Sequence, residues 1–417
     1  MGLFHRHKHN QQPLDPRAQK ASLDHQKQSP AAPQLHPHPP PQCPAPTANG
    51  FKNVVYFANW SVYARKHFAA DIPVDQVSHV FYAFCHIDAN TGKLKFTDEW
   101  CDLQLPMADP RDPSKKVEGS IAQLQALKQT HRHLKAVLSI GGWATEGQFQ
   151  GMVASKDKLK AFITSCGDFI KKYKFDGIDV DWEYPQKHEM ASFVELLAGI
   201  RRELDGIRPG LSLSIAAPAG MDKLAQFDFQ GIDRYLDFWN VMCYDFAGGW
   251  STKTGYHANL FGDNGDNPLN CHDVIDYYIK HGIHPSRLVM GMPLYGRNFF
   301  GAATGDIGAP FTKERGPNPP VDQDTVDYNK LIPGQQNMDP RKVGASVYDP
   351  KAHLFITYDD VQCTRIKARY IQSNGLGGGM WWDSAGDTKD PQTSLVQTFF
   401  REMGGQEKLD HTPNWLG

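Results

Sequence analysis

Short apolar stretches rich in β-branched and aromatic residues recur along the chain from about residue 51. Their hydrophobicity is nearly continuous rather than alternating, which is typical of strands that are covered on both faces. The pattern predicts eight such strands, at residues 54–60, 79–87, 135–142, 177–183, 211–218, 238–246, 288–297 and 377–383.

Helical patterns lie between most of these strands. Residues 156–174 and 191–207 each place their apolar side chains on a single stripe, as an amphipathic helix does. Eight strands that alternate with helices and are joined by right-handed crossovers predict an α/β fold, the (β/α)8 TIM barrel. A doubly wound open sheet is the main competing fold. However, the first strand is not followed by the G-x-G-x-x-G turn that would support it.

Two connections break the regular spacing. Residues 88–115 are rich in loop-forming residues, and residues 298–357 separate the seventh strand from its helix. A structureless loop of that second length is uncommon in a compact domain. The second connection also contains strand-like pieces at residues 345–349 and 353–359. We therefore expect a small α+β insertion subdomain at residues 298–357.

The two ends of the chain differ from the barrel region. Residues 1–50 hold ten prolines, seven glutamines and one aromatic residue, Phe4. Such a segment buries too little apolar surface to offset the entropy of ordering, so a disordered tail is predicted. It lacks the apolar stretch of about 7–15 residues found in secretion signals. The prediction is a cytoplasmic protein or, alternatively, an extracellular one exported without a leader. Residues 404–417 are interpreted as a C-terminal tail.

Composition narrows the classes of function. The 417 residues include 44 Lys and Arg against 46 Asp and Glu, a net charge of −2. A near-neutral balance argues against nucleic acid and anionic membranes as partners. No run approaches the ~18–20 apolar residues of a membrane span. The seven cysteines are scattered and lack zinc-finger spacing. We expect a monomer without metal or other cofactor.

The strongest chemical signal is DGIDVDWEYP at residues 176–185, in the fourth predicted strand. Residues two apart in a strand face the same side, so Asp179, Asp181 and Glu183 project together into the barrel, each ~7 Å from the last. Burial of three neighbouring carboxylates suppresses their ionisation. At least one should keep its proton near neutral pH, as a general acid requires.

A divalent-metal site or a solvated acidic turn is the alternative interpretation of these carboxylates, because hard oxygen ligands bind magnesium or calcium. The bulky residues Ile178, Val180 and Trp182 alternate with them. This alternation favours a strand over a flexible metal-binding loop.

Five segments occur in order along the predicted strands: SIGGW at 139–143, DGIDVDWE at 176–183, MCYD at 242–245, MPLYGR at 292–297 and GMWW at 379–382. They resemble the strand-end motifs of family 18 glycoside hydrolases, the chitinases. The resemblance covers residues 51–403. It is strongest to fungal and bacterial members with an insertion domain, and it implies that 51–403 is the catalytic TIM barrel.

The resemblance implies hydrolysis of β-1,4 bonds in chitin or chito-oligosaccharides. Glu183 would protonate the glycosidic oxygen, and the substrate's own 2-acetamido oxygen would attack the anomeric carbon. The resulting oxazolinium intermediate would lead to retained configuration. Asp181 would hold the acetamide N–H and stabilise the positive charge, Asp179 would share a proton with Asp181, and Tyr244 would hydrogen-bond the acetamide carbonyl.

The resemblance also implies a substrate-binding set. Asp245 and Arg297 would bind sugar hydroxyls or acetyl groups, and Trp382 would form the floor under the cleaved sugar. The full set is Tyr56, Ser139, Gly142, Trp143, Met242, Asp245, Tyr295, Arg297 and Trp382. Some of these residues have a plainer alternative interpretation: Tyr56 and Met242 as core residues, and Gly142 as part of a simple turn.

Two other functions fit the same barrel. A chitinase-like lectin would bind the same sugars, but such lectins typically lack the acid that Glu183 provides here. An endo-β-N-acetylglucosaminidase acting on N-glycans would use the same chemistry, and the predicted insertion counts against it. Two assays separate the three functions: a chitinase releases the fluorophore from a fluorogenic chitobioside, an endo-β-N-acetylglucosaminidase releases N-glycans, and a lectin does neither.

Overall fold

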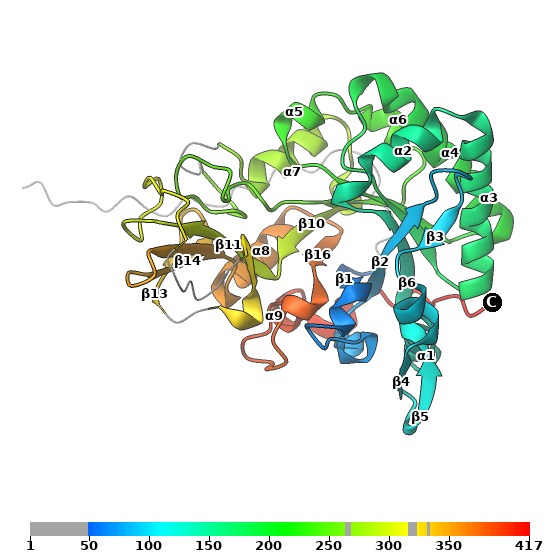
Figure 1. Cartoon of the computed structure of the whole chain (residues 1–417), viewed down its shortest axis with the longest axis horizontal. Coiled ribbons are helices and arrows are strands. Elements are labelled where there is room, and N and C mark those ends of the chain that lie inside the picture. The colour runs from blue at the N-terminus through cyan, green and yellow to red at the C-terminus, as the bar shows by residue number, and fades with distance from the viewer. Residues whose placement is uncertain (1–48, 263–267, 316–322, 332–333) are drawn as a thin grey trace, which may run out of the picture. The chain divides into compact units, whose positions relative to one another are not determined.

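The computed structural model describes residues 49–262, 268–315, 323–331 and 334–417. The predicted tail at 1–50 therefore lies almost wholly outside the described residues. Eight parallel strands pair side by side in the order β1-β2-β6-β7-β8-β9-β10-β16, and β16 pairs with β1 to close a barrel (Figure 1). The strands are β1 (Lys52–Ala58), β2 (His79–Ile87), β6 (Lys135–Gly141), β7 (Gly177–Asp181), β8 (Ser212–Ala217), β9 (Phe238–Val241), β10 (Leu288–Pro293) and β16 (Gly378–Trp382).

The predicted TIM barrel is thus confirmed, and each of the eight expected strands is present. Side chains alternate between two apolar regions. One fills the barrel interior, and the larger one lies between the strands and the surrounding helices. The interior set includes Val54, Tyr56, Phe81, Phe238, Met242, Val289 and Met380. Continuous hydrophobicity in the sequence reflects burial on both faces.

Helices flank the barrel, and the amphipathic patterns at residues 156–174 and 191–207 correspond to α3 and α4. The Ser155 hydroxyl accepts a hydrogen bond from the backbone N–H of Lys158 at the start of α3, and Lys174 ends that helix in the left-handed conformation. The helices are α1 (Gly119–Thr130), α2 (Glu146–Val153), α3 (Lys156–Tyr173), α4 (Met190–Ile207), α5 (Met221–Leu224), α6 (Phe229–Asp233), α7 (Cys271–Lys280), α8 (Val361–Ser373) and α9 (Leu395–Glu402).

The insertion after the seventh barrel strand is a five-stranded antiparallel sheet, at the yellow and orange end of Figure 1. Its strands, in the order β12-β11-β15-β14-β13, are β11 (Tyr295–Phe300), β12 (Thr325–Asp327), β13 (Gln335–Asp339), β14 (Gly344–Asp349) and β15 (Leu354–Tyr358). The run expected as one strand at 288–297 is divided. Leu294 donates its backbone N–H to Trp382 O at 2.8 Å, and the chain then leaves the barrel for the second sheet.

The loop-rich connection at 88–115 contains short strands. Strand β3 (Leu94–Phe96) pairs antiparallel with the end of β2. Strands β4 (Pro106–Asp109) and β5 (Asp112–Glu118) form a hairpin that projects at the bottom of Figure 1.

The C-terminal residues 404–417 are anchored near the amino ends of the strands. The Asn414 side-chain amide donates to the backbone oxygens of Lys128 and Leu134, at 2.9 and 2.8 Å. The backbone N–H of Trp415 donates to Asp176 Oδ1 at 2.6 Å. Asp176 is itself paired with the buried Lys128 at 2.7 Å. This end of the barrel is therefore covered by the chain's own last residues.

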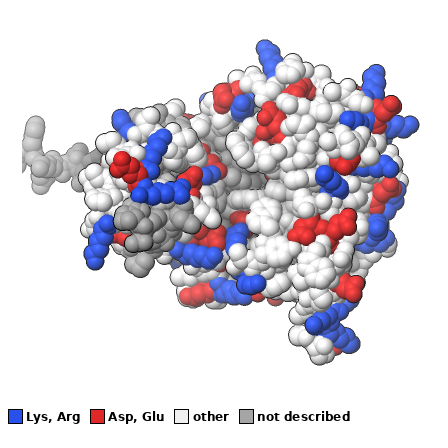
Figure 2. Space-filling model, in the orientation of Figure 1, with Lys and Arg blue, Asp and Glu red and all other residues white. Residues whose placement is uncertain are grey.

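Acidic and basic side chains are interspersed on the face shown in Figure 2, as the near-zero net charge suggests. Within the described ranges, every helix falls short of the length and apolar character that a membrane crossing requires.

Candidate active site

Strand β7 carries Asp179 and Asp181 of the acidic motif, and Glu183 follows two residues after Asp181. Asp179 is fully buried and Asp181 nearly so. The intervening Trp182 faces the other way and stacks on Phe149 of α2, with ring centroids 5.1 Å apart. The alternation predicted from the sequence therefore divides β7 into a carboxylate face inside the barrel and an apolar face against the helices.

Asp179 lies at the centre of a hydrogen-bond network from four other strands. Its Oδ2 accepts from the hydroxyls of Tyr56 and Ser139, each at 2.8 Å. Its Oδ1 accepts from the Ser214 hydroxyl at 2.8 Å and from the Asn240 amide at 3.4 Å. Burial raises the pKa of Asp179, while these hydrogen bonds stabilise the carboxylate and act in the opposite direction.

Asp181 has no comparable support. Its Oδ1 is buried and accepts no hydrogen bond from the described residues. Burial, followed by the charges of Glu183 and Asp179, places the pKa of Asp181 well above its usual range. A carboxyl in these surroundings keeps its proton near neutral pH.

Glu183 combines burial with a neighbouring hydroxyl. Burial raises the pKa of Glu183 to about 7, and the charge on Asp245 contributes in the same direction. The hydrogen bond with the Tyr184 side chain favours the carboxylate and limits the rise. Half of the Glu183 side chains thus carry a proton near pH 7, which suits a group that donates a proton and takes it back.

The wall beside these acids is built from Tyr244, Asp245 and the first residues of the insertion sheet. Tyr295 and Arg297 on β11 both donate to Asp245: the Tyr295 hydroxyl at 2.6 Å, and Arg297 Nε and Nη2 at 2.7 and 2.6 Å. Burial tends to raise the pKa of Asp245, but the contacts with His257 and Arg297 outweigh it and hold the pKa well below its usual range. The Tyr244 ring lies edge-on to Tyr295 at 6.2 Å.

Aromatic rings form a second surface of the site. Trp382 stacks on Phe84 with centroids 5.6 Å apart and also contacts Tyr56 at 5.4 Å and Trp60 at 6.3 Å. Trp60 is 46% exposed, so part of this surface faces solvent. Flat, partly exposed indoles provide an apolar surface that suits the faces of pyranose rings.

The remaining expected residues take different places. Met242 packs in the barrel interior, in the cluster that contains Tyr56. Gly142 has a φ of +97°, and a Cβ there would meet the Phe84 ring at 2.8 Å, so this position requires glycine. Trp143 is 78% exposed in the turn after β6. Its side chain is the most solvent-exposed of the predicted set.

Four contributors were not anticipated from the sequence: Ser214, Asn240, Tyr184 and Phe84. Ser214 and Asn240 lie on the interior faces of β8 and β9, where a polar residue in an apolar strand is a usable signal. Tyr184 lies within the DGIDVDWEYP segment, directly after Glu183. Phe84 lies in an apolar strand among other aromatic residues, and nothing local distinguishes it from the core.

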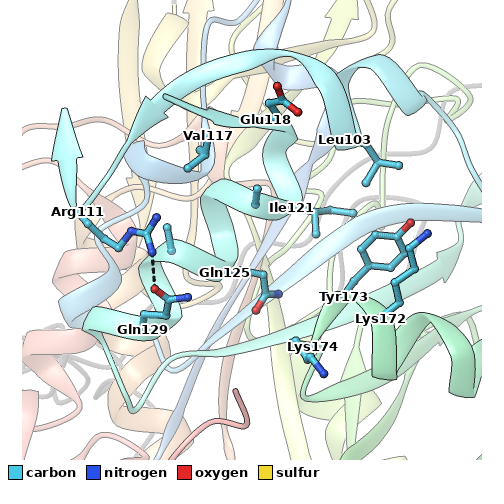
Figure 3. Close-up of a pocket in the computed structure, with 12 residues that line it drawn as sticks. Leu103, Arg111, Val117, Glu118, Ile121, Gln125, Gln129, Lys172, Tyr173 and Lys174 are labelled. Atoms are coloured by element: carbon cyan, nitrogen blue, oxygen red, sulfur yellow. Dashed lines mark hydrogen bonds between the residues drawn. The ribbon is translucent and has the colours of Figure 1, made fainter. Parts of the chain in front are cut away.

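A separate cavity of about 370 Å³ lies between α1, the β4–β5 hairpin and the end of α3 (Figure 3). Arg111 reaches across it to Gln129. None of its lining residues belongs to the acidic cluster or the aromatic surface, so it is distinct from the candidate site. Across the described parts of the chain, no three His, Cys, Asp or Glu side chains are grouped as metal ligands.

The arrangement is a proton donor next to a buried acidic pair, with a polar wall and an aromatic floor, at the mouth of a TIM barrel. The sequence profile of Glycosyl hydrolases family 18 matches residues 52–387, most of the chain. The chain belongs to this family. It is a glycoside hydrolase, as the motifs predicted.

Relatives of this family 18 chain share most of its length. It is 35% identical to "Endochitinase 1" of Metarhizium robertsii, over 88% of this chain and 89% of the relative. It is 34% identical to "Sporulation-specific chitinase 2" of Saccharomyces cerevisiae, over 84% of this chain and 77% of the relative. The catalytic domain of psychrophilic chitinase B from Arthrobacter TAD20 superposes with a TM-score of 0.80 and 27% identity, covering 89% of this chain and 99% of that one.

The predicted cytoplasmic location is wrong. It is contradicted by the fungal relatives of this family 18 chain, which are secreted extracellular chitinases. The prediction depended on the composition of the N-terminal segment, and residues 1–48 lie outside the described part of the chain. Composition there is therefore no guide to location.

Proposed function

We propose that the chain is a chitinase that hydrolyses β-1,4 bonds between N-acetylglucosamine units of chitin or chito-oligosaccharides. The observation that carries this proposal is the placement of Glu183 two residues after Asp181, beside the buried pair Asp179 and Asp181, where burial raises the Glu183 pKa to about 7. The relatives named as chitinases support the choice of substrate.

We propose that Glu183 transfers its proton to the glycosidic oxygen as the bond from that oxygen to the anomeric carbon breaks. The 2-acetamido oxygen of the same sugar forms the new bond to that carbon, giving an oxazolinium ion. Water then attacks the anomeric carbon, its proton passes to Glu183, and the acetamide is released. Two inversions at one carbon retain the configuration. Family 18 is an exception to the usual pair of catalytic carboxylates.

The remaining acidic and phenolic groups fit this route. Asp181, whose Oδ1 accepts no hydrogen bond from any described residue, would accept one from the acetamide N–H. Asp179 would share a proton with Asp181, and Tyr244 would donate to the acetamide oxygen and hold it close to the anomeric carbon. A negative field preorganised beneath a cationic centre stabilises the transition state without any rearrangement.

Substrate contacts are proposed for the wall and floor. Trp382 would stack under the reacting sugar, and Tyr295, Asp245 and Arg297 would hydrogen-bond the neighbouring unit. Trp143, which is largely exposed, would stack on a sugar farther along the chain. Tyr56 and Ser139 would act through Asp179, with Met242 and Gly142 shaping the space around the ring.

The proposal assigns catalysis to residues 51–403, with the insertion at 295–358 and with 404–417 as a C-terminal extension. It includes action as a monomer, without nucleic acid, and it requires no metal or cofactor in any step.

The decisive test compares two fluorogenic substrates, a chitobioside and the matched cellobioside, which lacks the acetamide. Rapid release from the first and none from the second is expected, because the nucleophile belongs to the substrate. Equal cleavage of both would contradict the mechanism. Binding of chito-oligosaccharides without any release would instead favour a lectin.

A further inference from the structure

Arg65 lies in the connection after β1 and joins two carboxylates from distant parts of the chain. Its Nη1 donates to Asp383 Oδ2 at 2.7 Å. Its Nε and Nη2 donate to Asp327 at 3.2 and 3.0 Å. The Arg65 side chain is only 18% exposed, so this is an enclosed cluster and not a solvated surface pair.

Each carboxylate adjoins one side of the active site. Asp383 directly follows Trp382, the aromatic floor. Asp327 is the last residue of β12 and pairs in register with Tyr295 on β11. Tyr295 in turn donates its hydroxyl to Asp245. One guanidinium therefore connects the floor to the wall that holds Asp245.

The same connection carries a third surface of the site. Trp60 lies five residues before Arg65, and its ring stacks on Phe84 at 6.1 Å and contacts Trp382 at 6.3 Å. Fixing Arg65 therefore also fixes the segment that bears this exposed indole. The three surfaces come from the connection after β1, from β16 and from the insertion, and their spacing depends on contacts between segments.

Charge makes Arg65 difficult to replace. Burial raises the pKa of Asp383 and Arg65 counteracts that rise, while the charge of Asp327 adds to it. Lys330 also pairs with Asp327, at 3.4 Å, but its side chain is 60% exposed. Without Arg65, Asp383 therefore loses its cation and the two carboxylates repel each other with only that exposed lysine beside them. A planar guanidinium bonds to both at once, whereas an ammonium is a single point charge that cannot present the same fork.

We propose that Arg65 is a positioning residue that sets the spacing between the Trp382 floor and the Tyr295–Asp245 wall of the sugar site. This inference rests on the proposed chitinase function. Arg65 acts through the residues on either side of it and takes no part in the bond-breaking step. The backbone bond from Leu294 to Trp382 keeps the two segments joined. Removal of Arg65 instead lets the side chains of floor and wall shift relative to each other, so a sugar between them is held less firmly and out of line with Glu183.

The test compares wild type with Arg65→Gln, Arg65→Lys, and Arg65→Gln combined with Asp327→Asn. Lys389→Gln is the matched control, because Lys389 pairs with Asp71 at 2.6 Å and joins the same connection to the chain after β16 at an exposed site. For each variant, kcat and KM for a fluorogenic chitobioside and for chitotetraose are measured together with the Tm.

Arg65→Gln should raise KM at least threefold and lower kcat/KM at least tenfold. Adding Asp327→Asn should raise kcat/KM at least threefold above that of Arg65→Gln alone, because it removes the repulsion between residue 327 and Asp383. For Lys389→Gln, both KM and kcat/KM should stay within twofold of the wild-type values. A merely structural role would reduce the amount of folded enzyme and leave KM unchanged.

An unchanged KM in a folded Arg65→Gln variant, or no recovery in the double variant, overturns the proposal. If Arg65→Gln does not fold, Arg65→Lys carries the test. It should raise KM at least threefold with a Tm close to wild type, and a KM equal to that of wild type overturns the proposal. Failure of the wild type itself to cleave either substrate would instead refute the proposed chitinase function.

Discussion

Tyr184→Phe should extend activity to higher pH. The Tyr184 hydroxyl hydrogen-bonds to Glu183 and favours its carboxylate, against the burial that raises the Glu183 pKa to about 7. Without that hydroxyl the protonated form of Glu183 is more stable relative to the carboxylate, so the Glu183 pKa rises further. The general acid then remains in its working form at a pH where the wild type has lost its proton.

The magnitude follows from the hydrogen bond. A hydrogen bond to a charged group contributes about 1.5–3 kcal/mol, and about 1.4 kcal/mol corresponds to one pH unit. Loss of about 1.5 kcal/mol moves the basic limb of the pH profile up by about one pH unit. At pH 8 the protonated fraction of Glu183 then increases from about a tenth to about half, a fivefold gain relative to each enzyme's own maximum.

The assay is the pH profile of kcat/KM for a fluorogenic chitobioside between pH 4 and 9, since this parameter reports ionisation in the free enzyme. Normalising each profile separates the position of the limb from any loss in absolute rate. Tyr235→Phe is the control, because Tyr235 precedes β9 and lies toward the amino ends of the strands. A limb that stays in place or moves to lower pH would refute the reasoning.

Four further outcomes are expected. Glu183→Gln should lower kcat at least 10³-fold while chitotetraose still binds by calorimetry. Because the Glu183 pKa rises from 4.5 to about 7 on folding, stability is full below pH 4.5 and falls as pH rises through 7. The free energy of unfolding of Glu183→Gln, relative to that of the wild type, should therefore be about 3 kcal/mol higher at pH 8 than at pH 4. Denaturant unfolding at the two pH values measures this difference. Ser214→Ala, which removes a 2.8 Å hydrogen bond to Asp179, should lower kcat/KM about tenfold, and an unchanged value would show that this bond is dispensable. Dialysis against EDTA should leave activity intact, whereas a loss that a divalent ion restores would contradict the metal-free mechanism.

Local pattern was sufficient for the barrel and for the core of the site. The eight strands could be recognised because burial on both faces leaves continuous apolar runs, and the TIM barrel they predict is confirmed. The shared face of Asp179 and Asp181 follows from the two-residue period of a strand alone. Ser214 and Asn240 were within reach of the same rule, as polar residues on the inner face of apolar strands.

Residues that are far apart in the sequence and hydrogen-bond only in the folded chain could not be paired from local sequence patterns. Arg65 meets Asp327 and Asp383 across 262 and 318 positions of the chain, and Asn414 meets Leu134 across 280. The insertion was expected as a separate subdomain after residue 297. Its first strand instead begins at Tyr295, and Tyr295 and Arg297 become part of the wall around Asp245.

By itself the sequence determined the strand–helix alternation, the line of carboxylates on β7 and the family to which the motifs belong. Only the tertiary structure decided which groups surround those carboxylates, and therefore which of them keeps its proton. The physical reason is that periodicity reports whether a side chain faces inward. Burial, charge and hydrogen bonding at Asp181 and Glu183 depend on strands and loops that meet only when the barrel closes.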